Sequence, residues 1–287
     1  MKIAVWHNLP SGGAKRALYD QVKGLLARGH EIEAWCPSTA DKSYLPLAEL
    51  IPEHVIPLEE ESRTVKVSKR FRFSPYAAGS VYRQMEQHCR ICADEISSGG
   101  FDLLFGNACE EYRVSPIARF VDIPSVIYLG EPNRWYYESL PELPWLAPEI
   151  DGSLLNPAVT VRVIRELMAI RHIRILARQE LRSAMAFDLI LTNSRYSRES
   201  ILKAYGIDSR VCYLGIDAEL FSMADREKQN IIVGVGSFDR IKNIEFVIRA
   251  VSLLDDFRPK LIWIGNSGES AYQEELIALA AKLGVDY

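Results

Sequence analysis

Short apolar runs alternate along the chain with longer segments in which apolar residues recur every three or four positions. The short runs predict buried strands, and the longer segments predict amphipathic helices. We expect strands at residues Ile3–Trp6, Glu31–Trp35, Val55–Pro57, Leu103–Phe105, Ser125–Tyr128 and Leu189–Thr192. We expect helices at residues Ala14–Arg28, Ala77–Ser97, Val114–Val121, Val161–Ala186 and Arg195–Tyr205. Strands that alternate with helices are typical of βαβ units, so the pattern predicts a parallel sheet in a doubly wound α/β domain that ends near Tyr213.

The alternation begins again after the polar stretch Ser222–Asn230. Strands are expected at Ile231–Val235 and Leu261–Ile264, with helices at Asn243–Leu254 and Tyr272–Leu283. The pattern therefore predicts two domains, residues 1–215 and 216–287. Because two parallel strands alone do not make a stable doubly wound sheet, we expect the second domain to be incomplete in this sequence.

The composition is that of a globular protein with room for two cores, since the 287 residues are 48% hydrophobic and 25% charged. The formal net charge of −4 argues against a nucleic-acid partner, which would require a clustered basic excess. The first residues, Met1–Trp6, resemble a buried strand and not a signal peptide. We expect a protein that is soluble or that lies on a membrane surface.

The five cysteines are an odd number and are thinly spread, which fits a reducing cytoplasm. Cys89 and Cys92 form a C-x-x-C sequence, but no second pair follows at the spacing of a zinc site. A redox or metal role remains open, although two ordinary helix cysteines are the favoured interpretation. We expect no metal.

Two glycine turns follow predicted strands and open predicted helices. At Gly12-Gly13 the absence of side chains lets a ligand approach the backbone, and the free N–H groups of a helix start favour anions. Near Gly236, two cations, Arg240 and Lys242, have the chemistry to bind a diphosphate. The alternatives are a tight turn without a ligand and two solvated side chains.

Several segments, in their order along the chain, resemble glycosyltransferase family 4, whose members have the GT-B fold. The resemblance begins with the Gly12-Gly13 turn and Gly29-His30. It continues with the family's N-S segment and its G-V-D-x-x-x-F and V-G-R-x-x-x-x-K-N sequences. The matching segments are Leu191–Ser197, Tyr213–Asp217 with Phe221, Val235-Gly236 with Lys242-Asn243, and Ile264-Gly265-Asn266.

The resemblance implies a retaining, metal-independent hexosyltransferase of bacterial-type polysaccharide or glycolipid synthesis. Its donor would be a nucleotide-diphosphate sugar held between two Rossmann-like domains, an acceptor-side domain and a partial donor domain, and its acceptor a glycan or lipid-linked sugar. No cofactor is expected. Lys242 would neutralise the leaving diphosphate. The implied donor-binding residues are Gly12, Gly13, Gly236, Ser237, Arg240, Lys242 and Gly265.

The sequence departs from the family pattern at three places. Ser237 stands where the family has an arginine, so Arg240 would have to replace it. Gly130 stands where a histidine is common, and the neighbouring Glu131 is our second candidate catalytic residue because it could orient a sugar by hydrogen bonding. A carboxylate that fixes the local backbone is the alternative. The family's E-x7-E region lies beyond the equivalent of Tyr287.

The acceptor-side candidates are Arg134, Trp135 and Asn193. Trp135 belongs to an aromatic group with Tyr136, Tyr137 and Trp145, and sugars stack well on aromatic faces, although core packing explains the group equally well.

The helix expected at Val161–Ala186 combines an apolar stripe with a basic face. The stripe consists of Ile170, Ile173, Ala177, Leu181 and Ala184, and the basic face of Arg171, Arg174, Arg178 and Arg182. A crossover helix with a solvated basic side is the favoured interpretation. The alternative is contact with an anionic membrane surface, aided by the basic segment Ser62–Pro75, which would place the protein peripherally on the cytoplasmic membrane face.

Two other functions remain open. A catalytically incompetent remnant that binds a nucleotide, a sugar or a protein partner would also fit, because half of the donor site is not in the sequence. A nicotinamide oxidoreductase fits poorly, because neither glycine turn has the full dinucleotide fingerprint.

Overall fold

A computed structural model describes residues 1–58, 77–109, 112–137, 150, 156–219, 221, 227–254, 259–265, 268 and 270–287. The chain divides into two compact units, Met1–Ile216 and Asp217–Tyr287. The basic segment Ser62–Pro75, Trp145 and Asn266 lie outside the described residues. In the part of the chain that is described, no helix is both long enough and apolar enough to span a membrane.

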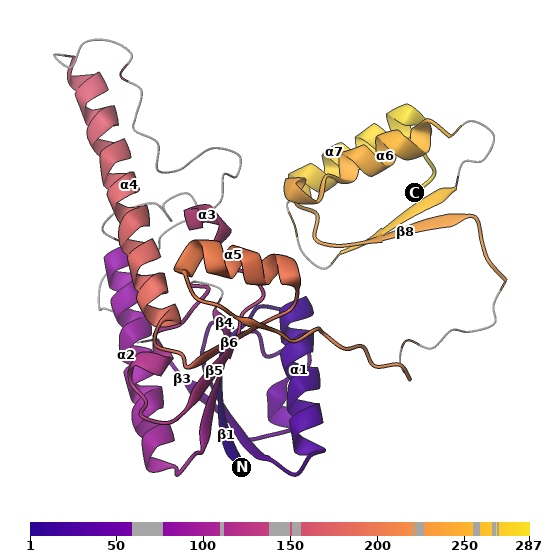
Figure 1. Cartoon of the computed structure of the whole chain (residues 1–287). Coiled ribbons are helices and arrows are strands. Elements are labelled where there is room, and N and C mark those ends of the chain that lie inside the picture. The colour runs from indigo at the N-terminus through magenta and orange to yellow at the C-terminus, as the bar shows by residue number, and fades with distance from the viewer. Residues whose placement is uncertain are drawn as a thin grey trace. The chain divides into compact units, whose positions relative to one another are not determined.

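The first unit contains a seven-stranded sheet in which every strand pair is parallel (Figure 1). The strand order is β3-β2-β1-β4-β5-β6-β7. The strands are β1 Lys2–Asn8, β2 Glu31–Pro37, β3 Glu53–Ile56, β4 Leu103–Cys109, β5 Ser125–Tyr128, β6 Leu189–Thr192 and β7 Arg210–Val211. The order reverses between β1 and β4, as in doubly wound nucleotide-binding domains. The doubly wound parallel sheet expected from the sequence is confirmed.

Helices cover the two faces of this sheet. They are α1 Gly13–Leu26, α2 Ala77–Ser98, the single turn α3 Arg134–Tyr137, α4 Pro157–Ala184 and α5 Arg195–Tyr205. Helix α1 packs on one face through Leu18 and Val22. Helices α2, α4 and α5 pack on the other face, where the core includes Trp6, Ala184 and Tyr205. Both faces bury apolar side chains, which is why the strands read as nearly continuous apolar runs.

The helix ends follow from local chemistry. Asn156 caps α4 by accepting a hydrogen bond from the backbone N–H of Ala158, and Pro157 occupies the first position, where no N–H is needed. Ser194 caps α5 by accepting from the N–H of Ser197. Gly206 ends α5 in the left-handed conformation, with φ of 70°.

Two details differ from the sequence prediction. The helix expected at Val114–Val121 is wrong, since only a single 3-10 turn, η3 (Ile117–Arg119), forms there. Pro116 lies within this stretch, directly before η3, and Pro124 follows it; proline removes a backbone donor and restricts the residue before it. Strand β7 was missed because its two residues, Arg210 and Val211, carry no apolar pattern.

The second unit contains a parallel pair of strands, β8 (Ile231–Val235) and β9 (Lys260–Ile264). A short 3-10 turn, η4 (Arg240–Lys242), leads into helix α6 (Ile244–Ser252), and helix α7 (Ser270–Leu283) follows β9. The two helices pack together on the strands around a core that contains Ile248, Leu261 and Tyr272. On β8, Val233 and Val235 are exposed.

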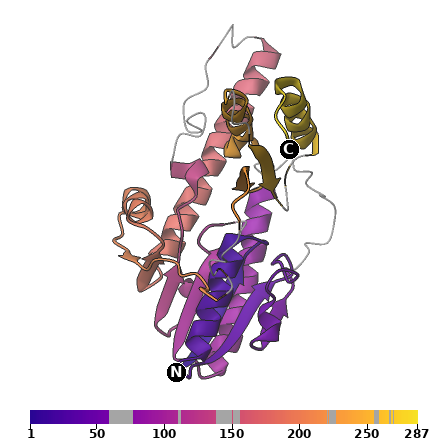
Figure 2. The same cartoon turned by 90° about the vertical axis from the view of Figure 1, so that its right-hand side faces the viewer.

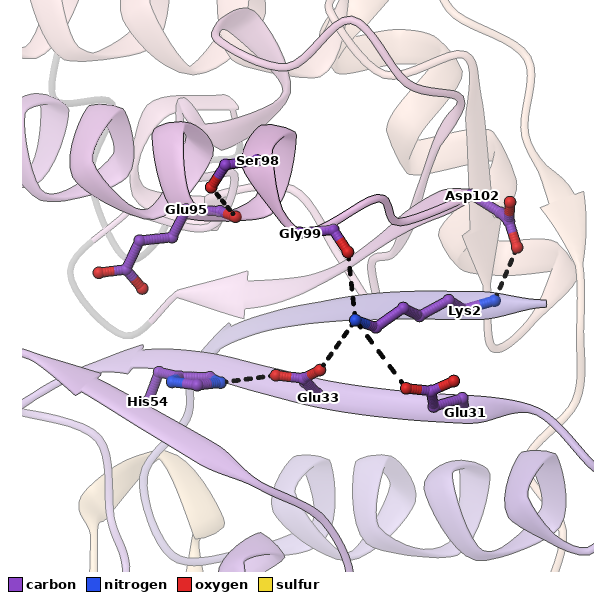
Figure 3. Close-up of polar contacts among 8 residues, drawn as sticks. All are labelled: Lys2, Glu31, Glu33, His54, Glu95, Ser98, Gly99 and Asp102. Carbon is purple, nitrogen blue, oxygen red and sulfur yellow. Dashed lines mark hydrogen bonds and ion pairs between the residues drawn. The ribbon is translucent and has the colours of Figure 1, made fainter.

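A polar network ties the amino-terminal ends of the first unit's strands together (Figure 3). The Lys2 Nζ donates to the carbonyl of Gly99 at 3.1 Å and lies 3.2 Å from Oε1 of Glu33. His54 lies 2.8 Å from the other oxygen of Glu33. These hydrogen bonds lower the pKa of Glu33. Because ligands of open α/β sheets bind at the opposite, carboxyl edge, we interpret this network as structural.

Candidate functional site

The carboxyl ends of the parallel strands in the first unit bring several polar side chains to one edge of the sheet. At the point where the strand order reverses, Asn8 at the end of β1 donates to Sγ of Cys109 at the end of β4, over 3.4 Å. The hydroxyl of Thr39, which follows β2, donates to the side-chain Oδ1 of Asn8 at 3.1 Å. Asn8 is fully buried, so its two contacts hold the ends of β1 and β4 and the segment after β2 together at this edge of the sheet.

The Gly12-Gly13 turn lies open at this edge. Gly12 has φ of 147°, a conformation that side chains rarely adopt, and a Cβ built on either glycine would meet no atom within 4 Å. Among the described residues, no side chain caps the first turn of α1. The turn therefore combines free space with uncapped backbone N–H groups, the arrangement that binds anions.

The ends of the neighbouring strands β5 and β6 bring Asn193 close to Gly130, the residue before Glu131. Glu131 forms an ion pair with Arg113, with 3.3 Å between the two groups, and both side chains are about half exposed. The amide of Asn193 would lie 3.3 Å from a Cβ on Gly130, the residue before Glu131. Asn193 is held from behind, because Ser197 donates to its carbonyl oxygen at 2.8 Å.

Arg134 and Trp135 form the start of α3, directly after this segment. Arg134 has polar or ring contacts of its own. The side chain of Trp135 lies outside what the structure describes. The backbone of Arg134 and Trp135 thus follows Glu131 by three and four residues, at the start of α3.

Sequence analysis did not identify Glu180, a buried carboxyl group on α4 that supports the same segment. Glu180 is 2% exposed. Its Oε1 accepts hydrogen bonds from the Tyr205 hydroxyl at 2.6 Å and from the backbone N–H of Asn133 at 3.0 Å. Burial raises the pKa of Glu180 to about 7, against the opposing effects of Tyr205, Asn133 and the nearby Arg113. A carboxyl group with a pKa near neutrality beneath a loop at the carboxyl edge is a candidate functional group.

A second buried polar group lies under the start of α1. His7 Nε2 lies 3.2 Å from Oε1 of Glu53, and this hydrogen bond lowers the pKa of Glu53. Burial raises the pKa of the Cys36 thiol to about 12. Lys15, in the first turn of α1, is fully buried, and its Nζ has no hydrogen-bond partner among the described residues. Burial lowers the pKa of Lys15, and the charge of Glu53 opposes that effect.

This cluster also has the chemistry of a metal site, because one ligand atom each of His7, Cys36 and Glu53 lie within 4.8 Å of one another. Histidine, thiolate and carboxylate are the ligands that zinc prefers. However, Lys15 already supplies a positive charge to the same buried space, and a divalent cation would be repelled by it. We therefore interpret the cluster as a buried His7–Glu53 hydrogen bond that lies within reach of the charge of Lys15.

In the second unit, the carboxyl ends of β8 and β9 bring Gly236, Gly265 and Lys242 together. The N–H of Gly236 donates to the carbonyl of Ile264 at 2.9 Å. A Cβ on Gly265 would lie 2.4 Å from the carbonyl oxygen of Gly236, so glycine is required at position 265. The aliphatic part of the Lys242 side chain lies beside Gly236. A Cβ built on Gly236 would be 3.7 Å from it, which is an ordinary van der Waals distance. Lys242 is exposed, and no carboxylate of the described residues pairs with it.

Arg240 is held by neighbouring side chains. Its guanidinium donates to both oxygens of Glu275, at 2.9 and 2.7 Å, and lies 3.5 Å from Glu245. It also lies 4.7 Å from the ring centre of Tyr272. Ser237 lies between Gly236 and this turn and is partly buried. Of the two cations predicted to meet a diphosphate, Lys242 is therefore the more available.

Comparison with known proteins gives the fold but no close relative. The sequence matches no protein-family model and no curated protein. HepE from Anabaena, solved with UDP and glucose, aligns over 99% of this chain and 67% of its own, with a TM-score of 0.58 and 16% identity. A glycosyltransferase from Rickettsia africae aligns over 99% of this chain and 66% of its own, with a TM-score of 0.57 and 12% identity.

The galactosyltransferase WaaB of the lipopolysaccharide outer core aligns over the whole chain and 66% of its own, with a TM-score of 0.51 and 14% identity. The chain thus spans about two thirds of the length of these proteins. At such low identity the likeness shows the fold alone. The α/β chain described here has the fold of the GT-B glycosyltransferases.

Proposed function

We propose that the chain is part of a family 4 glycosyltransferase, which moves a hexosyl unit with retention from a nucleotide-diphosphate sugar to a glycan or lipid-linked acceptor. The structural neighbours support a nucleotide sugar as donor. HepE was solved with UDP and glucose, and an Escherichia coli trehalose-6-phosphate protein with a TM-score of 0.51 was solved with UDP-2-fluoro glucose. The acceptor, the pathway of polysaccharide or glycolipid synthesis and the retention of configuration rest on the sequence resemblance.

The observation that carries the proposal is the position of Lys242 over the Gly236 turn. The turn lies at the carboxyl end of β8, where parallel sheets bind their ligands. Gly265 lets the backbone of β9 pack directly against the Gly236 carbonyl, and Lys242 adds a positive charge beside this turn. Negative charge builds up on a nucleoside diphosphate as it leaves the sugar, so a fixed cation there would stabilise the transition state more than the ground state.

On the first unit we propose that Glu131 orients a sugar hydroxyl and that Asn193 and Arg134 contact the acceptor. Arg113 supports this role because its ion pair with Glu131 holds the direction of that side chain. Trp135 would supply an aromatic face for a sugar ring. Gly12 and Gly13 would admit the phosphates or the acceptor to the start of α1, and no metal or cofactor takes part.

A second candidate function is binding of a nucleotide or sugar without transfer. The ion pairs of Arg240 with Glu275 and Glu245 favour it, since they leave one cation where the family pattern would supply two. Ser237, which replaces the family's arginine, cannot supply the charge. Detection of sugar transfer with any acceptor would exclude this alternative.

The test is calorimetry of the protein that carries this chain against a panel of nucleoside diphosphates, in the absence of metal. We expect one nucleotide to bind, and Lys242→Ala to weaken it by about 10- to 100-fold, the effect of losing one charge-assisted contact. Lys282→Ala, which removes an exposed lysine from α7, is the matched control. Equal affinity of wild type and the Lys242 variant, or binding of NAD in preference to every nucleoside diphosphate, would contradict the proposal.

A further inference from the structure

The short helix α3 and the residue before it, Asn133, are held against α4 by two polar contacts. Figure 1 and Figure 2 both show this single turn beside α4. The backbone N–H of Asn133 donates to Oε1 of Glu180 at 3.0 Å. The hydroxyl of Tyr137 donates to the carbonyl of Ala177 at 3.1 Å, three residues from Glu180 and so on the same side of α4. The carbonyl has no proton to lose, whereas the carboxyl group of Glu180 can change its charge.

The hydrogen bonds of Glu180 leave both of its protonation states incompletely satisfied. Its Oε1 accepts from the N–H of Asn133 and from the hydroxyl of Tyr205, so both lone pairs of that oxygen are used. Its Oε2 is buried and has no hydrogen-bond partner among the described residues. The proton of the neutral group must therefore lie on Oε2. Burial raises the pKa of Glu180 to about 7, so both states are populated near neutral pH.

The charged and titratable groups that face Glu180 come from three other segments. Among the described residues they are Tyr205 on α5, Tyr137 on α3 and Arg113 in the segment after β4. Burial raises the pKa of both tyrosines, so their hydroxyls stay protonated near neutral pH. The guanidinium of Arg113 is always charged, and its charge lowers the pKa of Glu180. A change of charge near pH 7 in this group of side chains therefore belongs to Glu180.

Glu131 is coupled to Glu180 by two routes. Pro132 is the single residue between Glu131 and Asn133. Proline has a fixed φ and restricts the residue before it, so a displacement of Asn133 is passed on to the backbone of Glu131. The second route is Arg113, which pairs with Glu131 over 3.3 Å and whose charge also acts on Glu180. The protonation of the buried carboxyl group is therefore felt at the exposed one.

We propose that Glu180 is a positioning residue for sugar binding: its ionised carboxylate holds the N–H of Asn133 and so fixes the direction of Glu131, and protonation of Glu180 loosens this hold. A hydrogen bond to an ionised group is roughly twice as strong as one between neutral groups. Ionisation therefore strengthens this one contact, although it destabilises the first unit as a whole. The hold on Asn133 stands on the contacts of Glu180, while its effect on a sugar at Glu131 rests on the proposed function.

The first test follows the backbone amide of Asn133 by NMR, in ligand-free protein labelled with nitrogen-15 at asparagine. The Asn133→Ser variant identifies the signal by its absence. We expect the amide proton shift to titrate with a midpoint of about 7, because the charge beside it changes there. In Glu180→Gln the shift should stay constant, since glutamine does not ionise. Arg113→Gln should raise the midpoint by roughly half a pH unit, because a positive charge that favours ionised Glu180 is lost.

Arg198→Gln is the matched control for Arg113→Gln, and it should leave the midpoint unchanged. The two side chains are 50% and 42% exposed, and each forms an ion pair, Arg198 with Asp208. A histidine that titrates near pH 7 would still move the signal in Glu180→Gln, so that variant separates the two causes. An Asn133 signal that is constant between about pH 5.5 and 8.5, or that titrates alike in Glu180→Gln, would overturn the proposal. Should Glu180→Gln fail to fold, an unchanged midpoint in Arg113→Gln would overturn it.

The second test asks whether sugar binding follows the same group, by calorimetry of the protein that carries this chain with UDP-glucose as the probe. Wild type and Glu180→Gln should bind it equally near about pH 5.5, and wild type about fivefold more tightly near about pH 8.5. Glu199→Gln, the control, should match wild type at both. Equal affinities of wild type and Glu180→Gln at both pH values would overturn control of Glu131 by Glu180. No binding by either protein would count against the proposed function, and the ligand-free titration of Asn133 would still decide the role of Glu180.

Discussion

Replacing Glu180 with glutamine should change how the stability of the first unit depends on pH. Burial raises the pKa of Glu180 from its ordinary value of 4.5 to about 7 in the folded protein. The folded state therefore holds the proton more tightly than the unfolded state. The stability that results is fully present below about pH 4.5 and is lost as the pH rises through about 7.

The size of the effect follows from these two values. At about 1.4 kcal/mol for each pH unit between 4.5 and about 7, ionisation of Glu180 costs the folded state roughly 3 kcal/mol. Glutamine keeps an oxygen that can accept from Tyr205 and Asn133 and carries no charge. Its amide N–H groups need partners that the site does not provide, which costs about 1–2 kcal/mol at every pH. We therefore expect Glu180→Gln to be slightly less stable than wild type near pH 5 and more stable near pH 8.5.

The assay is urea unfolding followed by tryptophan fluorescence in a Trp263→Phe background. Every other tryptophan lies in the first unit, so the signal then reports that unit alone. At each pH, the free energy of unfolding of the variant is compared with that of its parent. The contributions of all other titrating groups cancel in this difference, so its change between the two pH values reports Glu180 alone. We expect that difference to move by about 3 kcal/mol in favour of the variant.

Glu199→Gln is the control, since Glu199 is an exposed carboxylate on the neighbouring helix α5. Its effect should be the same at both pH values. A Glu180→Gln difference that changes by less than about 1 kcal/mol would refute the reasoning, because the native carboxyl group would then titrate as it does in the unfolded chain.

Two further changes test buried contacts elsewhere in the chain. Lys15→Met should destabilise the first unit by about 2–4 kcal/mol, because the charge of Lys15 acts with the His7 hydrogen bond to stabilise the ionised Glu53 carboxylate, and Lys23→Met on the exposed side of α1 should change stability by less than about 0.5 kcal/mol. Thermal unfolding of both variants and the wild type is the measurement, and equal melting temperatures for Lys15→Met and wild type would contradict a stabilising role for the Lys15 charge. Gly234→Ala should lower the stability of the second unit by at least about 2 kcal/mol, since the new Cβ would lie 2.2 Å from the ring of Trp263, whereas Gly236→Ala meets nothing closer than 3.6 Å. Tryptophan fluorescence of the two variants is the measurement, and a Gly234 variant as stable as the Gly236 variant would contradict it.

The strands and long helices were predictable because each buries one face, and burial leaves a period in the sequence. The Val114–Val121 segment shows where this reasoning fails. Its apolar residues Val114 and Ile117 have helical spacing and are indeed buried, yet the prolines around them allow only one turn of 3-10 helix. The spacing of apolar residues indicates which side chains are buried. Whether the segment that carries them forms an α-helix depends on the backbone hydrogen bonds that it can make.

The gathering of Gly12, Glu131 and Asn193 at one edge of the sheet was predictable for a different reason. Gly12, Glu131 and Asn193 all follow predicted strands, and parallel strands end at one edge of a sheet. The contact between Asn193 and Gly130 also depends on β5 lying next to β6, which the topology supplies.

The spacing of Glu180 along α4 is one signal of its burial that the sequence does contain. Glu180 falls seven residues after Ile173 and four before Ala184, on the apolar face of a helix that is otherwise rich in exposed arginine. A single carboxylate among buried positions indicates a partner from elsewhere in the chain. That partner, Tyr205, lies 25 residues away, so its identity depends on the packing of α4 against α5 and could not be read from local spacing.

Two of the buried polar groups of the first unit lie close to the two segments that are proposed to meet ligands. Lys15, whose Nζ has no hydrogen-bond partner among the described residues, follows Gly13 by two positions. Glu180 holds the backbone of Asn133, two positions after Glu131. The ion pairs of Lys2 at the amino edge are partly exposed and have ordinary partners. At the Glu180 position a neutral side chain is expected to make a more stable domain at high pH, so we interpret the buried carboxyl group as one that is kept because it fixes a loop for function. The gain in stability expected for Glu180→Gln at high pH should therefore come with weaker binding at the Glu131 segment, because the charge that anchors the N–H of Asn133 is lost.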